Sequence, residues 1–276
     1  MNAFYRAIGT SKQNVHQRLA HELARWEQAA QMEKIIYKVR KDHPAMGMKT
    51  LYKKLKPSWG RDAFYSWYRQ GGYRVPLSKN WRRTTDSTGV IRFPNLTEGK
   101  VLTGVNQVWV SDITYYELND EFCYLTFIMD QYSRKIKGFS VSRSLKTEHT
   151  TIPALQMALT HLHETEKPIF HSDGGGQYYS KALLSLMKGK FINSMGKTAY
   201  ENPYAERLNR TIKNDYIKWY DPGNFRELQL HCHRAVKMYN QDKPHSSING
   251  FTPDQFEAMA TNKLIVNNRS KTVNAI

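Results

Sequence analysis

The chain has 276 residues, which exceeds the usual size of one small domain and predicts two folded units. Hydrophobic residues make up 40% of the chain and aromatic residues 12%, enough for a core, which excludes wholesale disorder. No run approaches about eighteen apolar residues, so a membrane span or a secretion signal is not expected. Two cysteines cannot make a disulfide framework, and they fit a reducing cytoplasm.

The positive charge is concentrated near the N-terminus. The formal net charge is +17, and residues 1–100 carry 20 Lys and Arg against 7 Asp and Glu. Residues 101–276 carry 21 against 17. A basic segment beside a nearly balanced one indicates a polyanion-binding module attached to a part with a different task. A basic surface that only aids solubility is the alternative.

Residues 1–75 predict two tandem helix-turn-helix units. Ser11 is placed to cap a helix with apolar positions three or four residues apart, and a second helix is expected over 32–41. A further pair of short helices is expected on either side of the break at 57–60. A three-helix core without DNA contacts is the alternative. The candidate DNA-binding residues here are Lys12, Gln13, Asn14, His16, Lys49, Lys53 and Arg61.

Residues 76–100 are polar and predict a linker. Beyond it, three segments of alternating polarity predict an antiparallel meander, and further helices and short strands follow. The order predicts an RNase H-like α/β core over residues 101–260, preceded by the all-α helix-turn-helix region and followed by a polar tail, 261–276. The expected strands are 107–116, 122–130, 135–141 and 168–170, and the expected helices are 147–164, 179–187, 202–219 and 225–240.

Three carboxylates fall where this layout predicts an active site. Asp112 lies within the first strand, Asp173 follows a buried strand, and Glu206 lies one turn into a helix. Carboxylate oxygens are ligands that Mg²⁺ prefers, and two such ions can promote attack on a phosphodiester and departure of its leaving oxygen. The chain has no Walker loop and no nucleophilic-serine elbow. The residues of 231–233, His-Cys-His, are too close together for one tetrahedral zinc site, and we interpret them as packing or surface residues.

The three motifs in this order resemble the DDE transposases of bacterial insertion sequences, of the OrfB type, whose catalytic core is similar to retroviral integrase. The resemblance covers nearly the whole chain, including the segments 43–55, 106–115, 171–180, 194–206 and 239–253. It implies that Asp112, Asp173 and Glu206 are the catalytic residues and metal ligands. Only 32 residues separate Asp173 from Glu206, slightly fewer than in the family, and Gly174 replaces a common arginine.

Glu201 is a rival for Glu206, which is favoured because it lies in an Ala-Glu motif and shares a helix face with Lys213. Asn202, Arg210 and Lys213 are further candidates for DNA contacts along the same ridge. Lys213 is expected to contact phosphates or terminal bases, and a solvated lysine is the alternative.

The predicted function is Mg²⁺-dependent transposition, with two ions per active site and Mn²⁺ as a substitute. Water attacks a phosphodiester and frees a 3′-hydroxyl, which then attacks another. The expected partners are double-stranded DNA (terminal inverted repeats and target), further copies of the chain on DNA, and a companion OrfA protein. The expected location is the bacterial cytoplasm, at the nucleoid. A catalytically inactive DNA-binding regulator and a structure-selective nuclease are the alternatives.

Overall fold

The computed structural model describes residues 5, 9–76, 93–196 and 201–262. The chain divides into two units, residues 1–44 and 45–276. The first contains α2 (Lys12–Asp42), whose start is capped as predicted, since Ser11 Oγ accepts a hydrogen bond from Asn14 N at 3.1 Å. The separate helix expected from residue 32 was wrong, because α2 runs without interruption. Residues 27–34 contain neither glycine nor proline, and most have high helix propensity.

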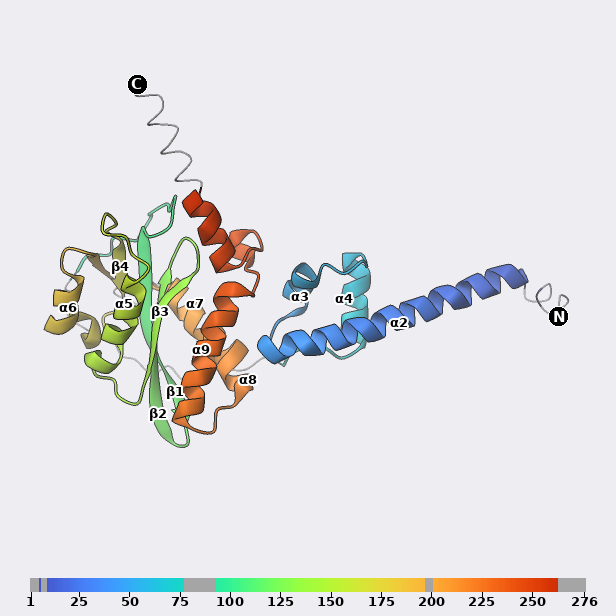
Figure 1. The fold of residues 1–276 in the computed structure, drawn as a ribbon, viewed down its shortest axis with the longest axis horizontal. Helices are drawn as coiled ribbons and strands as arrows, with labels where there is room; N and C mark the ends of the chain where they lie inside the picture. Colours follow the sequence, from blue (N-terminus) through green and yellow to red (C-terminus); the bar gives the residue numbers. More distant parts are fainter. Residues whose placement is uncertain (1–4, 6–8, 77–92, 197–200, 263–276) are drawn as a thin grey trace, which may run out of the picture. The chain divides into compact units, whose positions relative to one another are not determined.

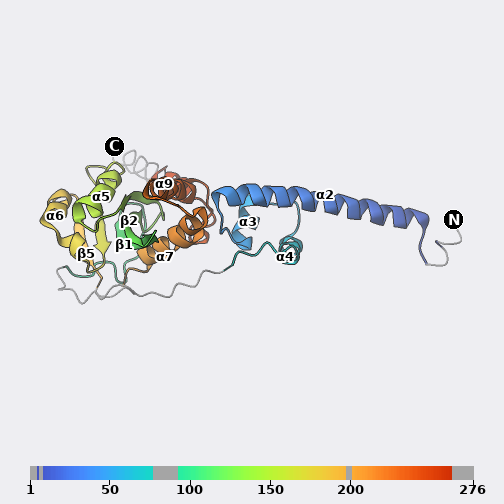
Figure 2. The ribbon, with the colours of Figure 1, turned by 90° about the horizontal axis from the view of Figure 1, so that it is seen from below.

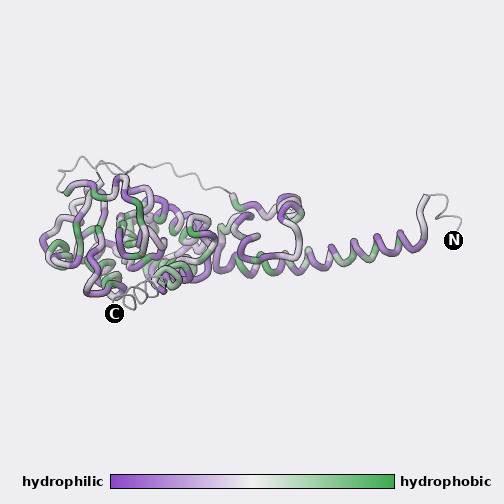
Figure 3. Tube along the Cα trace, turned by 90° about the horizontal axis from the view of Figure 1, so that it is seen from above, coloured by the Kyte–Doolittle hydropathy of each residue, from purple (hydrophilic) through white to green (hydrophobic). Residues whose placement is uncertain are grey.

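Helix α2 has no broad apolar face. Figure 3 shows polar residues along its length with apolar ones interspersed. Leu19, Leu23 and Trp26 are 52%, 64% and 74% exposed. Along this stretch the helix is therefore favoured mainly by the local propensity of its residues.

The second unit begins with two short helices, α3 (Met48–Leu55) and α4 (Arg61–Gln70), at the predicted positions. Phe64 is fully buried, and its ring lies 5.5 Å from that of Tyr52 and 5.8 Å from that of Trp67. Aromatic packing thus holds this pair of helices together. Lys56 ends α3 in the left-handed region, with φ of 45°.

Five strands form one mixed sheet in the order β3-β2-β1-β4-β5. The first three pair antiparallel, as the predicted meander requires, and β4 and β5 run parallel to β1. This topology, with helices on both faces, confirms the predicted RNase H-like α/β class. The strands are β1 (Val108–Leu118), β2 (Glu121–Asp130), β3 (Ile136–Ser142), β4 (Ile169–Ser172) and β5 (Ile192–Met195).

The helices follow the predicted order, although α5 ends five residues before the predicted end because turns begin at Thr160. Helix α7 continues through a π-helical turn into α8, so the predicted single helix over 202–219 has a wider turn within it. The bounds are α5 (Thr151–Leu159), α6 (Lys181–Met187), α7 (Pro203–Thr211), η4 (Ile212–Ile217), α8 (Lys218–Tyr220), α9 (Phe225–Gln241) and a last helix over 253–262. Short 3₁₀ turns are η1 (Thr147–His149), η2 (Gly176–Tyr179) and η5 (Ser246–Ile248). None of the helices in the described ranges combines the length and the apolar character needed to cross a membrane.

Alternation along β1 places its side chains in two cores, one on each face of the sheet. Val108 and Val110 pack in the cluster formed with α7 and α9, whereas Trp109 packs with α5 and α6 on the other face. Figures 1 and 2 show these helices on opposite sides of the strands. Asp112 lies two positions after Val110 and therefore points to the same face of the sheet, toward α7.

The last residues of the expected linker run beside β5. Leu96 N donates to Ser194 Oγ at 2.8 Å, and Met195 N donates to Pro94 O at 3.3 Å. Residues 77–92 of the linker and residues 263–276 of the expected tail lie outside the described residues. The predicted domain division at residues 75 and 100 stays a prediction.

Candidate active site

Asp112 and Asp173 meet just beyond the point where the parallel pairing of β1 and β4 ends. Val110 on β1 pairs with His171 on β4, so the residues two positions further along each strand lie at the same level. Asp112 belongs to β1, and Asp173 comes directly after β4. Parallel pairing therefore brings together two acids that are 61 positions apart in the chain.

The two carboxylates are in an environment that disfavours their charges. Burial and, to a smaller extent, the negative charge of Asp173 raise the pKa of Asp112 to about 7. The hydrogen bond from Asn209 Nδ2 to Asp112 Oδ2, 2.8 Å long, opposes this rise. Burial also raises the pKa of Asp173, whose Oδ1 accepts from Gly175 N at 3.1 Å.

Glu206 is the third acid of this group. Asn209, one turn further along α7, contacts Asp112, so the same face of the helix brings Glu206 toward the two aspartates. Its side chain is 54% exposed, and Glu206 Oε1 lies 3.5 Å from Arg210 Nη2, one turn along the helix. An exposed pair of this kind contributes little to stability, so Glu206 is free to take another cation.

Glu201 lies in a different environment. Its Oε2 accepts from Asn95 Nδ2 at 2.8 Å, and its backbone oxygen lies 3.1 Å from His171 Nε2. The geometry thus favours Glu206 over Glu201 as the partner of the two aspartates.

One face of α7 and its π-helical continuation is fastened to β1. Asn202 Nδ2 donates to Ser111 O at 2.9 Å, and Asn209 contacts Asp112 as described. Further along, Lys213 Nζ donates to Thr114 Oγ1 at 2.9 Å and to Tyr115 O at 3.0 Å. These contacts fix the distance between Glu206 and the strand that carries Asp112.

The three residues of this helix that were expected to contact DNA, Asn202, Arg210 and Lys213, differ in their exposure. Asn202 is 5% exposed and lies beneath the ridge, and Lys213 is half-buried against β1, where burial lowers its pKa. Arg210 is exposed beside Glu206. Sequence reasoning did not single out Asn209, although its position three residues after Glu206 places it on the same helix face.

The residues fit a hard divalent cation. No group of three or more His, Cys, Asp or Glu side chains within the described ranges is gathered closely enough to hold a metal ion. The donor set is nonetheless made of oxygens alone, and the mutual repulsion that raises the pKa of Asp112 is what a bound cation relieves. Buried Asn209 Oδ1 also has no hydrogen-bond partner among the described residues.

The residues of the expected N-terminal DNA-binding region are exposed. Lys12, Gln13, Asn14 and His16 all lie in the first two turns of α2. Lys49 and Lys53 lie on α3, and Arg61, at the start of α4, pairs with Asp62 at 3.0 Å.

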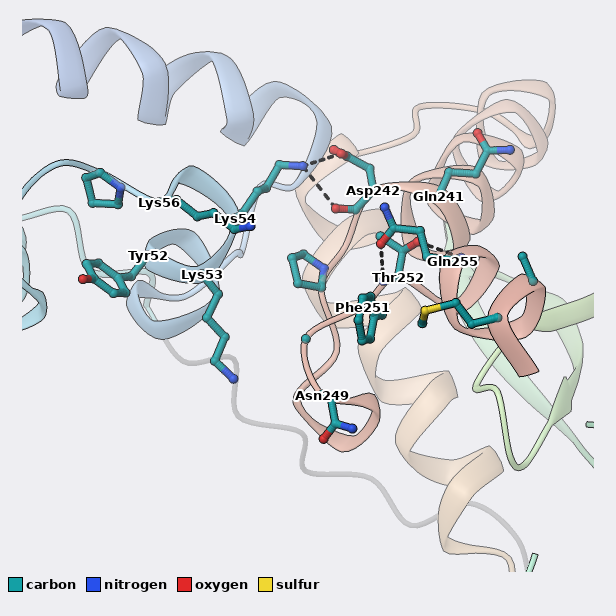
Figure 4. A pocket seen from close by; sticks show the side chains of 15 residues that line it. Tyr52, Lys53, Lys54, Lys56, Gln241, Asp242, Asn249, Phe251, Thr252 and Gln255 are labelled. Atoms are coloured by element: carbon teal, nitrogen blue, oxygen red, sulfur yellow. Dashed lines mark hydrogen bonds and ion pairs between the residues drawn. The ribbon is translucent and has the colours of Figure 1, made fainter. Parts of the chain in front are cut away.

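Lys53 lines a groove of about 1130 Å³ between α3 and the segment that follows α9 (Figure 4). Lys54 and Lys56 line it as well, and Lys54 pairs with Asp242. The groove thus presents three basic side chains near the end of α3.

The His-Cys-His segment packs as predicted, with His231 against Tyr220, His233 against Phe139, and Cys232 in the core.

Comparison with known proteins identifies the family. Residues 103–194 and 188–253 match two models of the integrase core domain. The chain is 27% identical to the insertion element IS600 uncharacterized 31 kDa protein of Shigella sonnei over 260 residues, which cover 90% of this chain and 95% of that protein. It is 30% identical to the transposase InsF for insertion sequence IS3A of Escherichia coli over 159 residues, 56% of this chain and 55% of InsF. The match thus spans about half the length of InsF.

Solved structures similar to this chain include two retroviral integrase catalytic core domains. That of HTLV-2, in complex with magnesium, is 22% identical, with a TM-score of 0.46 over 55% of this chain and 96% of that one. That of BIV is 18% identical, with a TM-score of 0.45 over 58% and 99%. The matches to the integrase core models and to insertion-sequence proteins show that the chain belongs to the insertion-sequence DDE transposases with an integrase-like core.

Proposed function

We propose that this transposase cleaves and joins DNA strands at the ends of its insertion sequence, with Asp112, Asp173 and Glu206 as the catalytic metal ligands. The observation that carries the proposal is the contact of Asn209 on α7 with Asp112 on β1, which holds the helix that carries Glu206 against the strand that lies beside Asp173. The three come from a strand, the loop after another strand and a helix, so only the fold brings them together. Structural ion pairs bury opposite charges, whereas this group brings like charges together.

The proposed metal is Mg²⁺, with Mn²⁺ as a substitute and two ions per site. Bound ions would supply the positive charge that makes an attacking oxygen nucleophilic and stabilises the departing one. The chain's own residues prepare the site. Asn209 orients the Asp112 carboxylate, Gly175 N orients that of Asp173, and the contacts of Asn202 and Lys213 hold α7 over β1.

The substrate is double-stranded DNA, both the terminal repeats and the target. Basic exposed residues of the N-terminal helices, together with Arg210, are proposed to contact it, as the excess of positive charge in residues 1–100 supports. Assembly of several copies on DNA, a companion OrfA protein and a location at the nucleoid remain part of this proposal. The presence of all three acids argues against an inactive regulator.

Purified protein, incubated with labelled DNA carrying the insertion-sequence ends and with Mg²⁺ or Mn²⁺, tests the proposal. We expect a nick at the end of the element followed by strand joining. Binding without cleavage would indicate the regulator, and cleavage without end preference would indicate a nuclease.

Matched carboxamide variants test the assignment of the acids. Asp112→Asn and Glu206→Gln should reduce cleavage to a few per cent of wild type or less, about two orders of magnitude, because each removes a ligand's charge at nearly constant shape. Glu201→Gln is the control and should retain activity, since its partner is Asn95. Loss of activity in Glu201→Gln together with full activity in Glu206→Gln would reverse the assignment.

A further inference from the structure

A second, smaller cavity of about 190 Å³ lies on another flank of α7. Three segments supply its basic side chains: Arg134 comes from the turn between β2 and β3, Arg207 from α7, and Lys243 from the segment after α9. None of the described residues that line it is acidic. The cavity therefore gathers positive charge in a place that the carboxylate site does not use.

Arg134 has an unfavourable backbone conformation and two unpaired donor atoms in this cavity. Its φ is 65°, a region that glycine and asparagine adopt more easily, and non-glycine residues there cost about 1 kcal/mol or more. The guanidinium carbon lies 4.2 Å from the centre of the Tyr204 ring. Nε and Nη1 are buried without a hydrogen-bond partner among the described residues. The guanidinium of this half-buried residue hydrogen-bonds with the Tyr204 hydroxyl, but its two buried donors remain unpaired among the described residues. Unpaired buried donors are unfavourable, which indicates that an acceptor is missing from this site.

Arg207 supplies a second guanidinium. It is exposed, and no ion pair joins it to a described carboxylate. Arg134 and Arg207 both line the cavity, together with Tyr204 and Tyr239. Lys243 contributes less, because its Nζ pairs with Asp215 Oδ2 at 2.9 Å.

We propose that this cavity, the Arg134–Arg207 pocket, binds one backbone phosphate of the DNA on which the transposase acts. Guanidinium groups bind phosphate oxygens through charge-assisted hydrogen bonds, and the cavity suits a small anion. Arg207 follows Glu206 directly, so the two side chains leave α7 about 100° apart. One helix thus presents a carboxylate toward Asp112 and a phosphate contact toward the β2–β3 turn. The inference rests on the proposed function for its substrate.

Full-length protein and a duplex of the insertion-sequence end, with a chelator present so that no cleavage occurs, provide the test. Arg134→Gln and Arg207→Gln should each weaken DNA binding about tenfold at about 0.1 M salt. Each should also reduce the slope of log affinity against log salt concentration by about the amount that one phosphate contact contributes. The matched control is Arg226→Gln, an exposed arginine at the start of α9, about 20 Å along that helix from Tyr239. Arg207→Gln keeps the test valid if Arg134→Gln does not fold, because Arg207 is exposed.

Methylphosphonate substitution of single phosphates identifies the contact. At one DNA position, replacing the phosphate by the neutral methylphosphonate should weaken binding by the wild-type protein. The same replacement should not further weaken binding by Arg134→Gln or Arg207→Gln, because these variants have already lost that contact. Additive losses at every position, or unchanged binding in both variants, would overturn the proposal. The proposal would also be overturned if inorganic phosphate raised the Tm of wild type but not of the pocket variants while no methylphosphonate position behaved non-additively. This result would identify a site for a free anion. If the wild type cleaves the insertion-sequence ends but no methylphosphonate position shows a non-additive effect with the pocket variants, only the pocket proposal is overturned. If such a non-additive effect is found but the wild type does not cleave, only the proposed activity is overturned.

Discussion

At the level of single residues, Asp112 lies within β1 and Asp173 directly after the neighbouring β4, and burial opposes the ionisation of both. The charge of Asp173 further opposes the ionisation of Asp112. The protein compensates only in part, through a backbone donor from Ile113 and an amide donor from Asn209 to Asp112, and a backbone donor from Gly175 to Asp173. Such incomplete compensation destabilises the metal-free protein when both groups are ionised. It also produces a measurable dependence of stability on pH.

We predict that the metal-free protein loses stability as pH rises through the range between the two pKa values of Asp112. The pKa of Asp112 is about 7 in the folded chain and near its ordinary value of 3.8 in the unfolded chain. Between these values the folded state binds more protons, so the free energy of unfolding falls as pH rises. Asp112→Asn removes this loss and should be more stable than wild type at about pH 8 by roughly 2–4 kcal/mol, several degrees in Tm.

Thermal unfolding with a chelator, measured at about pH 5 and about pH 8, checks this prediction. Asp120→Asn is the control, because Asp120 is exposed and should show no such gain. Added Mg²⁺ or Mn²⁺ should raise the Tm of wild type at the higher pH but not that of Asp112→Asn. A variant as sensitive to pH as wild type would assign the effect to another group.

At the level of elements, the docking of α7 on β1 sets the position of Glu206. Asn202 is the N-cap residue of α7, yet its side chain makes no capping hydrogen bond and instead donates to Ser111 O. Asn224 is the N-cap of α9, and its side chain accepts from Glu227 N at 3.0 Å in the usual way. The two asparagines therefore occupy the same helix position with different tasks.

We predict that Asn202→Ala and Asn224→Ala each lower the free energy of unfolding by about 1 kcal/mol. Asn202→Ala loses the bond to Ser111 O, and Asn224→Ala loses the capping bond from Glu227 N together with an exposed bond to Glu227 Oε1. Only Asn202→Ala should lower the rate of DNA cleavage, about tenfold or more, because the start of α7 is no longer tied to the strand that carries Asp112. Chemical denaturation and the cleavage assay measure the two effects. Equal cleavage by both variants would show that this contact does not position Glu206.

At the level of the whole molecule, charge and chemistry are distributed unevenly. Residues 1–100 hold most of the net positive charge, whereas all three proposed catalytic acids lie beyond residue 100. Both core clusters are also formed by residues beyond 100. The sheet unit therefore contains its own core and its own acidic site, and the N-terminal segment supplies most of the charge for a polyanion.

We predict that a fragment of residues 1–75 binds insertion-end DNA with an affinity that falls steeply as salt rises, because its basic side chains displace counterions from DNA. A fragment of residues 93–276, which retains both core clusters, should bind more weakly and with a shallower salt dependence. Titrations at several salt concentrations compare the slopes. Binding that maps only to the second fragment would contradict the proposed division of tasks.

Local patterns in the sequence determined the elements and their order. Alternating polarity marked β1 to β3, the cap at Ser11 marked the start of α2, and the motifs singled out Asp112, Asp173 and Glu206. These features depend on neighbours within a few positions, which periodicity and capping report directly. The same local view failed at residue 32, where it predicted a second helix inside α2.

Contacts between distant segments were decided only by the tertiary structure. The sequence favoured Glu206 over Glu201 only by its motif and helix face, whereas the fold places α7 against Asp112 and pairs Glu201 with Asn95. Likewise, Arg134 and Arg207 are 73 positions apart and meet only in the folded chain. Periodicity tells which face of an element a residue occupies, but not which segment lies opposite that face, because this depends on the packing of the whole core.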